Sequence, residues 1–146
     1  MDGKPTQSDY QELAEFRYRL RKFLHFSQQA AIDVGITPNQ HQLLLSIAGY
    51  PSRSWMTPTE IAERLQVRHH SALGLIQRCE KLNLVRRFDH PTDGRSVCIE
   101  LTDHGRDILE RLTVRHQAEL RRLGLSHTNF MVRDIPAFMV VEGDES

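Results

Sequence analysis

The sequence predicts a mainly α-helical fold with one small β-hairpin. Two short apolar stretches, residues 84–88 and 97–101, enclose the turn-forming residues 91–94, a pattern typical of a hairpin. Two short helical patterns precede it, over residues 57–65 and 69–82, and a longer helical pattern lies on either side of this core. With 146 residues, of which 39% are hydrophobic, the chain suits one domain with a modest core.

The first long helix is predicted over residues 9–34. Its apolar residues recur mainly at spacings of three and four, and Gly35 follows them. Thr37 and Pro38 then start a second helix, because threonine caps helices and proline fits the first helical position. Gly49 stops it.

The next two helices form a helix-turn-helix. Thr57, Pro58 and Glu60 make a capping box that starts the first of them. After a turn, the second runs from about residue 69 to 82, and its apolar residues recur on one face: Ala72, Leu75, Ile76 and Cys79. The other face is polar or small: His69, His70, Ser71, Gly74, Gln77 and Arg78. Such side chains can bond base edges or phosphates, although the alternative is a solvated helix face.

The hairpin carries Arg95 at its tip, with Arg86 and Arg87 on its first strand. An arginine on a thin ribbon can enter a DNA minor groove, where negative potential is concentrated. Asp93 is positioned to orient the Arg95 guanidinium through a hydrogen-bonded pair. An ordinary solvated turn is the alternative, but joined to the helix pair the hairpin completes a winged helix-turn-helix and favours DNA binding.

The charge distribution supports a nucleic-acid partner although the formal net charge is zero. Residues 64–95 contain seven Lys or Arg against three acids, whereas residues 134–146 contain four acids and no base. A local basic patch, rather than the total, determines attraction to phosphates.

Several other classes are disfavoured. No apolar run reaches the roughly 18 residues that a membrane span requires, and the two cysteines suit a reducing compartment, so we expect a cytoplasmic protein without membrane contact. There is no glycine-rich phosphate loop, nucleophile elbow or carboxylate pair, and the eight histidines lack metal-ligand spacing. We therefore expect no enzyme, no cofactor and no metal.

Several segments resemble the MarR family of bacterial transcription regulators. The similarity lies in residues 35–40, 60–65 and 78–87, and in a wing that combines Asp93-Gly94-Arg95 with Leu101-Thr102 and Gly105. The resemblance implies that the helix over residues 69–82 lies in the major groove. The DNA-contacting residues would then be Arg68, His69, His70, Ser71, Gln77 and Arg78, with Arg95 as the wing arginine and Asp93 as its companion.

Five positions depart from the family pattern, the mildest being Ile36 in place of a more usual leucine. Arg68 stands where a capping serine is common, Cys79 where leucine is usual, and His90 where an aspartate often precedes the wing proline. Asn83 replaces the glycine that usually ends the recognition helix, but asparagine tolerates the left-handed conformation and can still terminate it.

The resemblance also implies a homodimer. The predicted domain spans residues 1–146: a DNA-binding core at 36–101, dimerisation helices at 9–34 and 102–123, and a tail at 124–146. The compact core cannot cover both long helices, so a second copy is the simplest partner, the alternative being that they pack on each other within one subunit. Two recognition helices about 34 Å apart would need a pseudo-palindromic operator.

The resemblance further implies a regulator, which we expect to be a repressor, that a small aromatic ligand could release from DNA. The residues that would line such a cleft are Tyr18, Phe26, His41 and Trp55, although the alternative, that each is an ordinary core residue, is the stronger one. The alternative function is a winged-helix module for protein–protein contact without sequence-specific DNA binding. That module would not need polar residues on the groove-facing helix.

Overall fold

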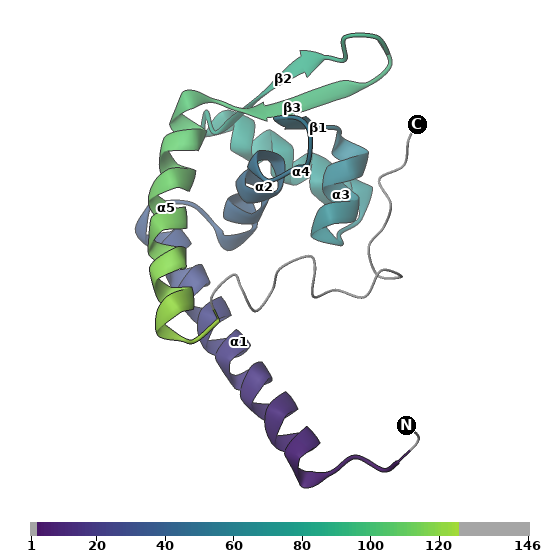
Figure 1. The fold of residues 1–146 in the computed structure, drawn as a ribbon. Helices are drawn as coiled ribbons and strands as arrows, with labels where there is room; N and C mark the ends of the chain where they lie inside the picture. Colours follow the sequence, from purple (N-terminus) through teal and green to yellow (C-terminus); the bar gives the residue numbers. More distant parts are fainter. Residues whose placement is uncertain (1–2, 126–146) are drawn as a thin grey trace. The chain divides into compact units, whose positions relative to one another are not determined.

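The computed structural model describes residues 3–125. The elements follow one another as α1 (Gln7–Asp33), α2 (Pro38–Ala48), β1 (Trp55–Met56), α3 (Pro58–Leu65), α4 (His69–Lys81), β2 (Val85–Asp89), β3 (Val97–Leu101) and α5 (Asp103–Arg122) (Figure 1). The predicted helical fold with a small β wing is confirmed. The predicted tail at 124–146 lies, apart from its first two residues, outside the described residues.

The chain divides into two compact units. One is formed by residues 28–114 and contains the whole predicted core at 36–101, together with the inner ends of α1 and α5. The other combines residues 1–27 with residues 115–146, and its described part consists of the outer portions of the same two helices and the residues next to them.

The wing is part of a three-stranded antiparallel sheet in the order β1-β3-β2. The hairpin register pairs Arg86 with Glu100 and Phe88 with Cys98, while Trp55 of β1 pairs with Glu100 from the other side. The sequence analysis predicted the two hairpin strands but missed β1. A two-residue strand has no alternation to detect, and it forms because β3 offers a free edge.

Two capping boxes start the helices that the sequence analysis assigned to them. Thr37 Oγ1 accepts from the Gln40 amide at 3.1 Å, and Gln40 Oε1 accepts from the Thr37 amide at 2.9 Å. Thr57 and Glu60 repeat this exchange at the start of α3. Helix α3 ends at Gln66, whose φ of 55° is left-handed, so the chain turns at once into α4.

The core of the larger unit lies between the inner faces of α2, α3 and α4 and the sheet. Every apolar position predicted for α4 is buried there. The largest fully buried side chains of this unit are Leu43, Leu44, Ile47, Met56, Ile61, Ile76, Leu84, Ile99 and Leu112, with the smaller Cys79 and Cys98. The opposite face of α4 is therefore left for contacts outside the domain.

The start of α5 is joined to the end of the helix-turn-helix. Thr102 caps α5 as predicted, because its Oγ1 accepts from the Gly105 amide at 3.0 Å. The same hydroxyl donates to the Asn83 carbonyl at 2.5 Å, and the Thr102 amide donates to the Leu84 carbonyl at 3.1 Å. Gly105 packs so closely that a Cβ there would lie 2.1 Å from the Leu84 oxygen, so only glycine fits.

In the smaller unit, α1 and α5 contact each other through a buried histidine. His116 Nε2 lies 2.8 Å from Ser27 Oγ, and its ring meets the rings of Phe23 and Phe26 edge-on at 5.7 and 5.4 Å. Much of the remaining apolar surface of α1 in this unit is exposed, at Tyr10, Leu13, Phe16, Tyr18 and Leu24, and so is Ile32 of the same helix in the larger unit.

Candidate nucleic-acid interface

The outer face of α4 carries the polar residues that the sequence analysis singled out. Arg68, His69, His70, Ser71, Gln77 and Arg78 are all exposed, whereas the apolar residues of the same helix are buried. Gly74, between them, is half-buried, and the Arg78 side chain folds back over it, with Nη1 3.3 Å from the position of a Cβ. The helix therefore presents a continuous hydrogen-bonding surface.

The two ends of α4 differ in how they are capped. At the start, Arg68 is extended and its carbonyl accepts from the Ala72 amide at 3.0 Å, but its side chain makes no capping hydrogen bond. At the end, Asn83 has φ of 57°, and the Leu84 amide donates to the Cys79 carbonyl at 2.9 Å. The prediction that Asn83 terminates the helix in a left-handed conformation is confirmed.

The arginines of this region fall into two groups. On the strand, Arg86 pairs with Glu100 at 2.5 Å and Arg87 pairs with Glu80 at 2.9 Å, so neighbouring carboxylates partly offset both charges. Within residues 3–125, Arg68 and Arg78 have no such ion pair. Their charges and that of Arg95 are the ones most available to a phosphate.

Asp93 and Arg95 occupy the wing tip, and the Arg95 side chain is 98% exposed. Arg95 Nε lies 3.9 Å from Asp93 Oδ1, beyond hydrogen-bond length. The carboxylate instead accepts from the Arg95 amide at 3.0 Å and from Ser96 Oγ at 3.1 Å. Asp93 thus shapes the backbone that carries the arginine, rather than making the predicted hydrogen bond to its guanidinium.

A polar and aromatic cluster at the root of the wing was not predicted. Arg53 forms an ion pair with Glu60 and lies over two rings, 4.6 Å from the centre of Tyr50 and 3.9 Å from that of Trp55. Trp55 in turn meets His90 edge-on at 5.2 Å. The sequence analysis assigned Glu60 only to its capping box, and nothing in the local pattern links it to Arg53.

Glu60 connects this cluster to the start of α3. Desolvation alone would raise its pKa, but hydrogen bonds from the Thr57 amide and hydroxyl and from Tyr50 Oη, together with the Arg53 charge, hold the pKa of Glu60 below its ordinary value. The carboxylate is therefore charged in the folded protein at neutral pH.

The two cysteines lie under the interface rather than on it. Cys79 is on the inner face of α4 and Cys98 is in β3, both buried and unbridged. Desolvation raises the pKa of the Cys79 thiol to about 12 and also raises that of Cys98. Both side chains are therefore neutral thiols in the folded state.

The four residues predicted to line a ligand cleft are divided between the two units. Tyr18 and Phe26 belong to the smaller unit, where Tyr18 is exposed and Phe26 packs against His116. His41 and Trp55 belong to the larger unit, where His41 is buried in α2 and Trp55 joins the cluster at the wing root.

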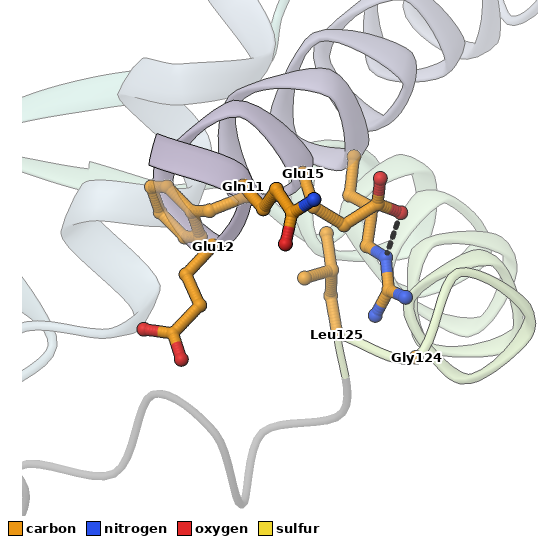
Figure 2. A pocket seen from close by; sticks show the side chains of 7 residues that line it. Gln11, Glu12, Glu15, Gly124 and Leu125 are labelled. Atoms are coloured by element: carbon orange, nitrogen blue, oxygen red, sulfur yellow. Dashed lines mark hydrogen bonds and ion pairs between the residues drawn. The ribbon is translucent and has the colours of Figure 1, made fainter. Parts of the chain in front are cut away.

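A pocket of about 470 Å³ lies in the smaller unit. Figure 2 shows it between α1 and the residues Gly124 and Leu125, which follow α5. Two of its lining residues, Glu15 and Arg19, form an ion pair of 2.9 Å. Its lining consists of Gln11, Glu12, Glu15, Phe16, Arg19, Gly124 and Leu125, and it includes none of the four predicted residues.

Two further features bear on the class of protein. No helix within residues 3–125 has the length and apolar character needed to cross a membrane. In that same part of the chain, His, Cys, Asp and Glu side chains do not gather in groups of three or more that could hold a metal ion.

Comparison with known proteins agrees with this geometry. The MarR family model matches residues 34–96, from the end of α1 to the wing loop. A protein of Thauera aromatica described as a putative transcriptional regulatory protein for the hcr operon is 28% identical over 131 residues, 82% of this chain and 75% of that protein. The transcriptional repressor MdtR of Bacillus subtilis is 31% identical over 88 residues, 60% of this chain and 55% of MdtR.

The fold is shared with a mutant of E. coli MarR complexed with operator DNA, at a TM-score of 0.62 and 23% identity over 81% of each chain. Residues 34–96 are thus similar in sequence to the MarR family, and the fold is that of solved MarR proteins.

Proposed function

We propose that this regulator binds double-stranded DNA, with α4 in the major groove and Arg95 of the wing in the adjacent minor groove. The observation that carries the proposal is the division of α4 into a buried apolar face and an exposed face of Arg, His, Ser and Gln side chains. A wing arginine that is 98% exposed supports it. A winged helix used for protein contact would not require this polar face.

Within this proposal the residues have distinct roles. Arg68 flanks the uncapped start of α4, where backbone N–H groups and the helix dipole favour a phosphate. Ser71 and Gln77 can hydrogen-bond base edges, while His69, His70 and Arg78 reach bases or phosphates. Asp93 holds the backbone that presents Arg95.

The test is the salt dependence of DNA binding. Neutralising phosphates releases counterions, so affinity should fall steeply with ionic strength, and Arg95→Ala should make the slope of log K against log salt shallower by about 0.9. Arg111→Ala is the matched control, because Arg111 is an exposed arginine whose ion pair with Asp107 stays within α5. Equal slopes for all three proteins would contradict a phosphate or groove contact by the wing.

We further propose that the chain acts in the cytoplasm as a homodimeric repressor on a pseudo-palindromic operator. The exposed apolar side chains of α1 support a second copy as partner, since a lone subunit would leave them in water. The repressor role follows the description of MdtR. Sedimentation should give twice the chain mass, and footprints should cover an inverted repeat with half-sites about one helical turn apart. A monomer at DNA-binding concentrations would contradict the dimer.

Release by a small aromatic ligand is the last part of the proposal, with Tyr18, Phe26, His41 and Trp55 as its binding residues. Titrating aromatic acids into the protein–operator complex tests it. Release that Phe26→Ala weakens would support the assignment, and affinity unchanged by every compound would contradict it.

A further inference from the structure

The wing loop is closed by a histidine ring. His90 Nδ1 lies 3.1 Å from the Thr92 amide and 3.0 Å from the Asp93 amide, and both amides donate to it. A ring nitrogen can accept these bonds only if it carries no proton, so the geometry requires a neutral ring protonated on Nε2. The ring thus takes the place of an aspartate or asparagine side chain that accepts from the backbone two residues on.

The rest of the loop depends on this start. The His90 amide donates to the Ser96 carbonyl at 3.2 Å, and the Ser96 amide donates to the Asp93 carbonyl at 3.0 Å. The Asp93 carboxylate then fixes the Arg95 amide. Within the described residues, the loop therefore has two side-chain anchors for its amides, the His90 ring at its beginning and the Asp93 carboxylate just before Arg95.

The His90 ring is itself held from the body of the domain. Trp55 of β1 meets it edge-on, with an angle of 88° between the ring planes. Trp55 carries the Arg53 guanidinium on its face, and Arg53 pairs with Glu60 at the start of α3. A continuous set of contacts thus runs from the helix-turn-helix to the loop.

We propose that His90 is a positioning residue for DNA binding: its neutral ring closes the wing loop so that Arg95 is presented to the minor groove, and protonation of the ring releases the loop. This inference rests on the proposed DNA-binding function. His90 itself need not touch DNA, because it acts through the backbone of Thr92 and Asp93.

The inference makes the wing sensitive to pH. A protonated Nδ1 would direct an N–H at two other N–H groups, so both hydrogen bonds would be lost. The charged groups around this ring are Asp89 beside it in β2, Asp93 and Arg95 in the loop, and Arg53 across Trp55.

The test compares two substitutions of His90. In His90→Asn the side-chain oxygen accepts from the same amides at every pH, whereas His90→Leu has no acceptor. Affinity is measured by fluorescence anisotropy for a duplex that the wild-type protein selects from a random-sequence pool. We expect His90→Leu to weaken binding by about the same factor as Arg95→Ala, and the double variant to be no weaker than either single one.

The pH series separates positioning from a general structural role. The series runs from about pH 8 to 5, and comparison between variants at each pH cancels any change that the other residues of the interface undergo in every protein. The wild type should therefore lose affinity relative to His90→Asn as the pH falls. The ratio of the dissociation constants of His90→Leu and Arg95→Ala should stay constant over the same range. Backbone NMR provides a readout without DNA: the Thr92 and Asp93 amides should be protected from exchange in the wild type and His90→Asn, and unprotected in His90→Leu.

The possible failures are distinguishable. If Arg95→Ala weakens binding and His90→Leu does not, or if the amides exchange equally in all variants, the role of His90 is wrong and the DNA interface stands. If no duplex is selected, or if Arg95→Ala also binds like the wild type, the proposed wing contact fails first. Thermal melting of each variant in the absence of DNA confirms that the domain is folded.

Discussion

Gly105→Ala should destabilise the protein although Gly105 lies in a helix, where alanine is ordinarily better by about 1 kcal/mol. The reason is the contact with the wing root. An added Cβ would lie 2.1 Å from the Leu84 carbonyl oxygen, which belongs to the backbone and has little freedom to move. The first turn of α5 must shift by more than about 1 Å to restore an ordinary contact distance of about 3.5 Å.

The magnitude follows from what such a shift breaks. Overpacking costs about 1–3 kcal/mol. The bonds from Thr102 to the carbonyls of Asn83 and Leu84 are lost as well, at about 1 kcal/mol each. After subtraction of the gain in helix propensity, about 2–4 kcal/mol of destabilisation remains. At about 2–4 °C per kcal/mol, the melting temperature should fall by about 4–16 °C.

The assay is thermal and urea unfolding followed by circular dichroism at one fixed protein concentration, because association of the proposed kind would make the melting temperature depend on concentration. Gly74→Ala in α4 is the matched control. There an added Cβ meets only the flexible end of Arg78, at 3.3 Å, so this variant should gain up to about 1 kcal/mol. If Gly105→Ala is as stable as Gly74→Ala, the close approach to Leu84 does not constrain the fold.

Three further outcomes are expected. Folding lowers the pKa of Glu60, so the charged carboxylate stabilises the folded protein at pH values above its unfolded pKa of about 4.3. This stabilisation is lost as the pH falls through the lower pKa of the folded state. The stability difference between wild type and Glu60→Gln should therefore shrink in acid, and a constant difference would refute the assignment. Since burial raises the pKa of Cys79 to about 12, native protein should react with Ellman's reagent only after denaturation. Rapid labelling of folded protein would count against this. Asn83→Val should cost more than about 1 kcal/mol in urea unfolding, because a β-branched residue resists a φ of 57°, whereas Asn83→Gly should be neutral or better.

The parts of the fold that local chemistry determines were predictable. Thr37 and Thr57 mark their helix starts because the capping partners lie three residues away in the chain. Asn83 was correctly assigned to a left-handed helix end, because few other residues tolerate that conformation. The buried face of α4 followed from its apolar spacing, and with it the exposed residues proposed to contact DNA.

The features that sequence analysis missed depend on distant partners or on an unusual residue. Strand β1 exists because Trp55 and Met56 pair with residues more than forty positions away on β3. The Arg53–Glu60 pair forms because the chain turns back before α3. No periodic pattern in the sequence indicates this turn. His90 accepts from amides only two and three residues on, but histidine is rarely read as a turn residue.

The junction of α5 with Asn83 and Leu84 has a mechanical consequence. The Thr102 hydroxyl both caps α5 and donates to the carbonyl of Asn83, the residue that ends α4. Gly105 packs directly against the Leu84 carbonyl oxygen, so the two backbone segments cannot move closer together. Tilting the first turn of α5 must therefore also move the end of α4 and the first wing strand, to which these contacts join it.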